Sequence, residues 1–171
     1  MMRGKKRMEP KIISIPAKKI VGIRKETTFA KDPEVTMGIW KTFMPLRNRI
    51  PYRSNSCFLS VKVLNTPLNL NDINYSYEKW AAVEVEHFET DTVSELSTHT
   101  LAGGLYAVFI HQGTASDLST FQYIFQEWLP NSNYSLDVRE HFEVMDDNYR
   151  PDDLDAKEEV WIPIKVKTTD K

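Results

Sequence analysis

Glu143 is the residue with the most distinctive chemistry, because it is a carboxylate inside an apolar, strand-like run, His141-Phe142-Glu143-Val144-Met145. Burying an uncompensated charge in such a strand costs several kcal/mol, so the sequence predicts a partner for this acid. Side chains alternate along a strand, and Glu143 therefore shares its face with His141 and Met145. An acid, an imidazole and a thioether on one face suit a flat, apolar cation.

Two interpretations of Glu143 stay open at this point. In the first, the acid faces a ligand site and balances the charge of a bound cation. In the second, it is a structural acid held by backbone amides, by Lys62 or by Arg139. The large aromatic residues are as typical of a hydrophobic core as of a ligand contact. They are Trp40, Trp80, Trp128 and Tyr106.

The elements that must position these side chains form a repeat with a shift of 85 residues. The matched segments are Phe142-Glu143-Val144 with Cys57-Phe58-Leu59, Ile20-Val21-Gly22-Ile23 with Leu105-Tyr106-Ala107-Val108, and Pro130 with Pro45. Because these segments match in one register, the sequence predicts two diverged copies of one unit, about residues 9–88 and about 100–166. In this alignment Phe58 takes the place of Glu143, so only the second copy carries an acid there.

Hydrophobic spacing predicts the order strand, helix, strand, strand in each copy. The expected strands cover residues 12–23, with a break at 16–18, and then 57–63, 77–88, 106–110, 142–145 and 159–164. One helix is expected to start at Asp32 as its cap and to end at Pro45, and the other to run from Thr114 or Ser116 to Pro130. The predicted fold class is α+β: two pseudo-symmetric units that form an antiparallel sheet with two helices and a central ligand groove.

Length and charge limit the classes of function. The 171 residues fit a single domain, here residues 9–166, preceded by a basic, flexible N-terminus at residues 1–8. A net charge of -2 gives no general attraction to nucleic acid or anionic lipid, so neither nucleic acid nor a membrane is an expected partner. No membrane span and no signal peptide pattern is present, which favours a cytoplasmic protein.

Metal and cofactor chemistry is not expected. The single cysteine, Cys57, excludes an intrachain disulfide and a cysteine metal cluster. The four histidines lack the paired spacing of zinc sites, so no metal site is predicted. The sequence contains no Walker loop, no dinucleotide-binding glycine pattern and no nucleophile elbow, so no cofactor is expected.

Several segments together resemble the GyrI-like small-molecule-binding domain, also called the AraC-type effector-binding domain. The segments are Ala102-Gly103-Gly104-Leu105-Tyr106-Ala107-Val108-Phe109, His111-Gln112-Gly113, Glu127-Trp128-Leu129-Pro130, Phe142-Glu143-Val144 and Trp161-Ile162-Pro163-Ile164. The resemblance covers residues 9 to 166 and implies two strand-helix-strand-strand units around a central groove. It also implies that Glu143 lies in the ligand cleft and pairs with cationic, often aromatic compounds.

The leading functional prediction is therefore a non-enzymatic module that binds amphipathic, cationic small molecules. Its role would be drug sensing, multidrug recognition in transcription regulation, or sequestration. The groove is predicted to be lined by Glu143, Phe58, Trp40, Trp80 and Tyr106, with Met145 and His141 beside Glu143.

Two other functions remain as alternatives. Some relatives resemble hydrolases of reactive natural products, which use the glutamate together with a tyrosine. This chain has Met145 where that tyrosine often stands, so binding is favoured over hydrolysis by Glu143. By resemblance to free-standing inhibitors of DNA gyrase, the chain could instead bind a protein partner, such as gyrase or a regulator, through acidic residues at 146–147 or 152–153.

Overall fold

The computed structural model describes residues 8–89 and 93–168, and contains one antiparallel sheet of nine strands. The predicted basic N-terminus, apart from Met8, lies outside the described residues. The strands are β1 (Lys11–Ile15), β2 (Lys18–Thr28), β3 (Phe58–Val63), β4 (Ser76–Val85), β5 (Ser97–Leu101), β6 (Gly104–Gln112), β7 (Tyr134–Leu136), β8 (His141–Met145) and β9 (Lys157–Val166).

The order of the strands is symmetric about the centre of the sheet. It reads β1-β6-β9-β8-β3-β4-β2-β5, with β7 added to β9. β3 and β8 are the central pair, and each unit contributes its own strands outward from there. The leading strands are exchanged, because β1 pairs with β6 of the second unit and β5 pairs with β2 of the first. The predicted α+β class with an antiparallel sheet and two helical segments is confirmed.

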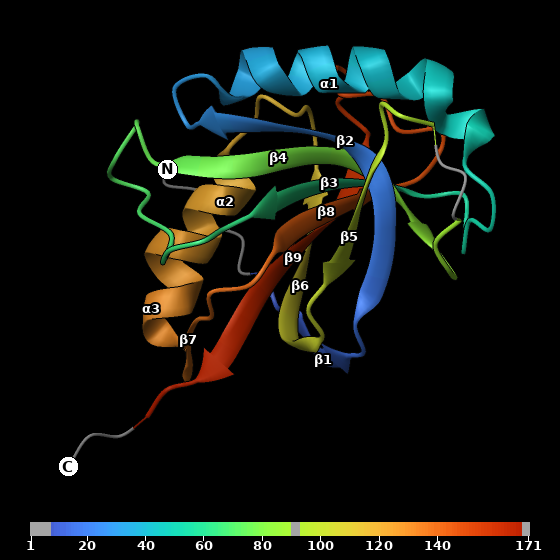
Figure 1. Ribbon diagram of the computed structural model, residues 1–171. Coiled ribbons are helices and arrows are strands. Elements are labelled where there is room, and N and C mark those ends of the chain that lie inside the picture. The colour runs from blue at the N-terminus through green and yellow to red at the C-terminus, as the bar shows by residue number, and fades with distance from the viewer. Residues whose placement is uncertain (1–7, 90–92, 169–171) are drawn as a thin grey trace.

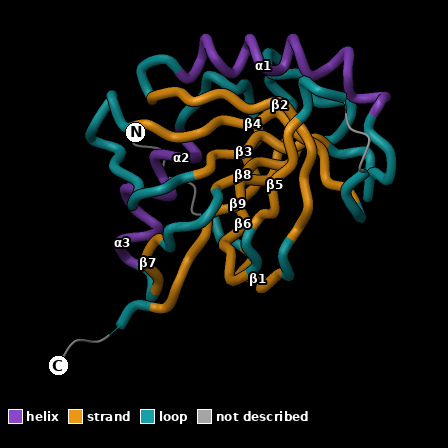
Figure 2. Tube along the Cα trace, viewed as in Figure 1, coloured by secondary structure: helices purple, strands orange, loops and turns teal. Residues whose placement is uncertain are grey.

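Both helical segments cover the same face of the sheet at opposite ends, as Figures 1 and 2 show. α1 (Asp32–Leu46) continues into a 3-10 turn, η1 (Arg47–Arg49), and packs on β2 and β4. The second segment consists of α2 (Ser119–Tyr123), the π-helical turn η2 (Ile124–Trp128) and α3 (Leu129–Asn131), and packs on β6 and β9. β3 and β8 therefore run between the two helical segments.

The ends of α1 differ slightly from the expectation. Its N-cap is Lys31, and Asp32 is the first helical residue, so the acid does not cap the helix. Pro45 lies inside the last turn rather than after it, one residue before the helix ends at Leu46. Ile39 and Phe43 are buried, as their helical spacing predicts.

The face away from the helices has its own core, because the sheet curls on itself. Side chains from strands near both edges meet there, including Leu101 of β5 and Tyr106 of β6, beside Trp80 and Phe142. The sheet is therefore buried on both faces. Strand alternation then decides on which face each candidate residue lies.

The shift of 85 residues does not hold for every strand. Following the pairing outward from Ser60 leads through β4 to Ile23. Following it outward from Met145, which the shift equates with Ser60, leads through β9 to His111. Strand pairing thus matches Ile23 with His111, whereas the shift of 85 residues matches it with Val108, three positions earlier. An odd displacement moves side chains to the other face, so the sequence alignment was wrong for β6.

Candidate functional site

A row of polar side chains crosses the middle of the helix-covered face, and we call it the polar strip. It consists of Ser60, Lys62, Lys79, Glu143 and Glu158, from strands β3, β4, β8 and β9. The pairings Ser60 with Glu143 and Lys62 with Lys79 place these side chains on the same face. Elsewhere on that face the hydrophobic clusters under the two helical segments fill the surface.

Glu143 has a lysine within reach. The Nζ atom of Lys62 lies 3.9 Å from Oε1 of Glu143, and the two side chains are 22% and 18% exposed. That separation exceeds the 2.7–2.9 Å typical of a charge-assisted hydrogen bond. The structure thus contains one of the protein cations considered from the sequence, as a loose and partly solvated ion pair.

Lys79 is buried and paired with the start of α1. Its Nζ atom lies 3.7 Å from Oδ2 of Asp32. Asp32 also accepts hydrogen bonds from the hydroxyl groups of Tyr77 and Thr36. Burial acts against its charge, but Lys79, Lys62 and these two hydroxyl groups hold the pKa of Asp32 below its usual value. Burial together with nearby Lys62 lowers the pKa of Lys79.

Glu158 is a second acid beside Glu143. It belongs to β9, is 6% exposed, and faces Met145 across the sheet. Burial, the charge of Glu143 and a hydrogen bond with Glu143 raise the pKa of Glu158 to about 8. Beside Glu143, the protonated form of Glu158 is therefore favoured at neutral pH.

His141 lies at the end of the strip below the second helical segment. Its ring centroid is 6.5 Å from that of Phe125. Its Nε2 atom is buried and has no hydrogen-bond partner among the described residues. Burial, with the charges of Lys62 and Arg139, lowers the pKa of His141 to about 3. The neutral imidazole contributes no positive charge to the site at pH 7.

The opposite end of the strip is apolar. Phe58 and Met145 pair across β3 and β8 and are both buried. Trp40 of α1 is partly exposed and meets Phe58 edge-on, with ring centroids 6.1 Å apart. The guanidinium carbon of Arg53 lies 5.2 Å from the centroid of the Phe58 ring. The structure thus brings Phe58, Met145 and Trp40 to the face that carries Glu143.

Trp80 and Tyr106, which were predicted to line the groove, lie on the opposite face and are 2% and 0% exposed. For Trp80 the reason is alternation, since it stands between Lys79 and Ala81, which face the helices. For Tyr106 the reason is the displaced register of β6. Its hydroxyl group donates to the carbonyl oxygen of Glu140, as expected of a core tyrosine.

Three charged residues of this region were missed in the sequence: Asp32, Lys79 and Glu158. Alternation could have identified the last two. Glu158 lies two and four positions before the buried residues Val160 and Ile162, so it shares their face of the strand. In the same way, Lys79 lies two positions before buried Ala81. Asp32 belongs to no strand pattern, and its position at the start of a helix was interpreted as a cap, so nothing in the sequence indicated its pairing with Lys79.

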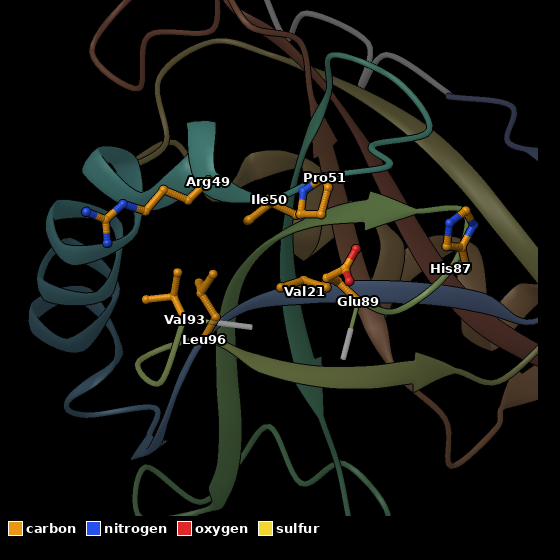
Figure 3. A pocket seen from close by; sticks show the side chains of 8 residues that line it. All are labelled: Val21, Arg49, Ile50, Pro51, His87, Glu89, Val93 and Leu96. Atoms are coloured by element: carbon orange, nitrogen blue, oxygen red, sulfur yellow. The ribbon is translucent and has the colours of Figure 1, made fainter. Parts of the chain in front are cut away.

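Two hollows on the surface lie away from the polar strip. One, beside the end of α1, measures about 20 Å³, enough for about one water molecule (Figure 3). It is lined by Val21, Arg49, Ile50, Pro51, His87, Glu89, Val93 and Leu96. The other is a broad, polar hollow of about 810 Å³ at the outer ends of β2 and β4. Neither is lined by a residue of the predicted site.

The structure also bears on metals and membranes. Within residues 8–89 and 93–168, no group of three or more histidine, cysteine, aspartate or glutamate side chains could hold a metal ion. None of the described helices is both long and apolar enough to cross a membrane.

Comparisons with solved structures show the same fold at low sequence identity. SAV2435 bound to tetraphenylphosphonium is 16% identical with a TM-score of 0.65, covering 92% of this chain and 94% of that chain. The C-terminal domain of EcmrR is 13% identical with a TM-score of 0.66, covering 94% and 99%. A hydrolase from Listeria innocua is 11% identical with a TM-score of 0.59, covering 92% of both chains. A search of curated proteins found no match.

The family assignment rests on the sequence as a whole. The model of the GyrI-like small molecule binding domain matches residues 8–165, nearly the full length of the chain. The symmetric sheet with its two helical segments agrees with the arrangement that the resemblance implied. The chain belongs to the family of GyrI-like small molecule binding domains.

Proposed function

We propose that this protein binds amphipathic cationic small molecules on the polar strip, with Glu143 as their charge partner. The observation that carries the proposal is the placement of Glu143. It is a partly exposed acid on the central strand pair, between the two helical segments, and its lysine partner is held loosely at 3.9 Å. The role would be sensing or sequestration of such compounds.

The neighbouring side chains support the same class of ligand. Phe58, Met145 and partly exposed Trp40 offer aromatic and thioether contacts to a flat ring system. The structurally similar SAV2435 binds tetraphenylphosphonium, which is a lipophilic cation. Drug-sized ligands are typically held by apolar contacts with a few polar groups that fix their orientation.

The proposal can be tested by titrating the protein with tetraphenylphosphonium in a calorimeter. We expect Glu143→Gln to weaken binding at least about tenfold, since interactions with charged groups contribute about 1.5–3 kcal/mol. The control is Glu84→Gln. Glu84 has a similar exposure of 19% and a lysine partner, Lys18 at 3.1 Å, but lies on the opposite face. Equal binding by wild type and Glu143→Gln would refute the proposal.

Hydrolysis of electrophilic compounds is the second candidate, favoured by one specific observation. Tyr149 lies near both acids: burial, with the charges of Glu158 and Glu143, raises its pKa. A protonated acid, a second carboxylate and a tyrosine hydroxyl could share general acid and base roles, although Met145 lacks the hydroxyl group of the family's usual tyrosine. The test is multiple turnover of an epoxide or cyclopropane substrate, with loss of turnover in both Glu143→Gln and Tyr149→Phe.

A further inference from the structure

The polar strip exposes a positive charge as well as a negative one. Lys62 is 22% exposed and Glu143 is 18% exposed, and their charged atoms are 3.9 Å apart. An ion pair at this distance, partly in water, contributes little to stability. A ligand can therefore contact either partner without breaking a strong hydrogen bond.

The other charges of the strip already have partners within the protein. Lys79 is paired with Asp32 at 3.7 Å and is 5% exposed. Glu158 is 6% exposed, and burial together with Glu143 raises its pKa to about 8, which favours its neutral form. One exposed lysine and one exposed acid thus remain for a ligand to meet.

A ligand with a single positive charge does not satisfy both groups. Its cation would approach Glu143 and would then lie within a few ångströms of the ammonium group of Lys62. Like charges that close repel, and the repulsion is strong where water is partly excluded. A ligand that also carries an anionic group would give Lys62 a new partner.

We propose that the polar strip selects amphoteric ligands, in which a cationic aromatic body binds at Glu143 and an adjacent carboxylate or similar anion binds at Lys62. This inference rests on the proposed function and specifies its ligand class. Lys62 then determines specificity: it favours ligands that carry both charges and disfavours simple monocations.

The sequence of contacts along β3 sets the order of groups in such a ligand. Phe58, Ser60 and Lys62 project from the same face, with Glu143 directly opposite Ser60. At about 3.3 Å per residue, Phe58 and Lys62 are about 13 Å apart along the strand. The ligand should therefore carry its apolar rings at the Phe58 end, its cation in the middle and its anion at the Lys62 end.

A matched pair of dyes tests the inference at pH 7. Rhodamine B carries a cationic ring system and a free carboxylate, whereas its ethyl ester has the same rings without the negative charge. By fluorescence polarisation, we expect wild type to bind rhodamine B about five- to tenfold more tightly than the ester. In Lys62→Met the preference should vanish or reverse, because the ester binds more tightly and the acid more weakly.

Three variants control the experiment. Lys62→Arg keeps the charge and should keep the preference for rhodamine B. Lys62→Gln removes the charge with a polar side chain, and should lose the preference if Lys62→Met folds poorly. Lys18→Met removes a lysine of similar exposure, 28%, from an ion pair on the opposite face, and should behave like wild type.

The outcomes separate this inference from the proposed function. Equal or weaker binding of rhodamine B relative to the ester in wild type would overturn the inference, as would an unchanged preference in Lys62→Met and Lys62→Gln. Failure of wild type to bind either dye would also overturn it. The proposed function would survive each result if tetraphenylphosphonium binding still depended on Glu143. If tetraphenylphosphonium, rhodamine B and the ester all bind Glu143→Gln as they bind wild type, both are refuted.

Discussion

The two central strands, β3 and β8, lie side by side between the two helical segments but carry different chemistry. Towards the helices β3 presents Phe58, Ser60 and Lys62, and β8 presents His141, Glu143 and Met145. The next strands continue the contrast, with Lys79 on β4 and Glu158 on β9. The first unit thus supplies the lysines of the strip and the second unit its acids. The backbone is symmetric, but the polar strip is not, because its lysines lie on the β3 side of the central strand pair and its acids on the β8 side.

The largest expected effect compares how closely the strands pack in the first unit and in the second. A Cβ atom on Gly22 of β2 would lie 2.0 Å from the carbonyl oxygen of Ala81 and 2.7 Å from Cα of Ala82. We expect Gly22→Ala to lower the free energy of unfolding by about 3 kcal/mol. Ala107→Gly, in β6 of the second unit, should cost about 1 kcal/mol. Urea unfolding measures both losses of stability. If Gly22→Ala lost less stability than Ala107→Gly, the first unit would not be the more sensitive of the two to a change in strand packing.

Acid should destabilise the second unit through His141. Its pKa is about 3 in the folded protein and 6.5 in a free side chain, so only the unfolded chain takes up the proton between these values. The stability that His141 contributes is complete above pH 6.5 and is lost as the pH falls towards 3. His141→Phe should reduce the loss of stability between pH 7 and pH 4 by about 2–3 kcal/mol. An unchanged pH profile of urea unfolding would contradict this.

A rise in pH towards 8 should destabilise the fold through Glu158, whereas His141 destabilises it when the pH falls. Because its pKa is raised from 4.5 to about 8, the unfolded chain releases the proton earlier than the folded protein does. Glu158 therefore destabilises the fold progressively from about pH 4.5 to pH 8. Glu158→Gln should remove this slope and gain about 2 kcal/mol relative to wild type at pH 8 compared with pH 5. Thermal unfolding at both pH values tests it, and parallel shifts of the two proteins would count against it.

The smallest effect is expected for the ion pair that joins the two units. Lys62→Met should change the free energy of unfolding by less than about 1 kcal/mol, because the pair is partly exposed and lies at 3.9 Å. A loss of several kcal/mol would show that the pair is structural. That result would weaken the assignment of Lys62 and Glu143 to ligand binding.

Much of the fold was predictable because it depends on patterns of hydrophobic residues. The central strands and α1 were found within a few residues, since Ile39 and Phe43 repeat at helical spacing. β5 was missed because its residues, Ser97–Leu101, are mostly polar and gain their order from pairing with β2. β7 was missed because a strand of three residues is too short to show an alternating hydrophobic pattern.

The site was only partly predictable, for reasons of register and distance. Alternation correctly grouped Glu143 with His141 and Met145 on one face. The position of Tyr106 depended on an alignment of the two units that was displaced by an odd number of residues, and no local pattern reveals such a displacement. The pairing of Lys79 with Asp32 joins β4 to the start of α1, 47 residues apart, which only the tertiary structure shows.

The exchange of leading strands has a consequence for the newly made protein. β1 pairs with β6, and Val108, the partner of Lys11, follows it by 97 residues. At a synthesis rate of about 5–20 residues per second, the ribosome needs about 5–20 s to make that partner. During this time the first unit also lacks β5 at its outer edge, so β1 and the outer edge of β2 stay open to other chains. Neither half can complete its sheet before most of the chain has been translated.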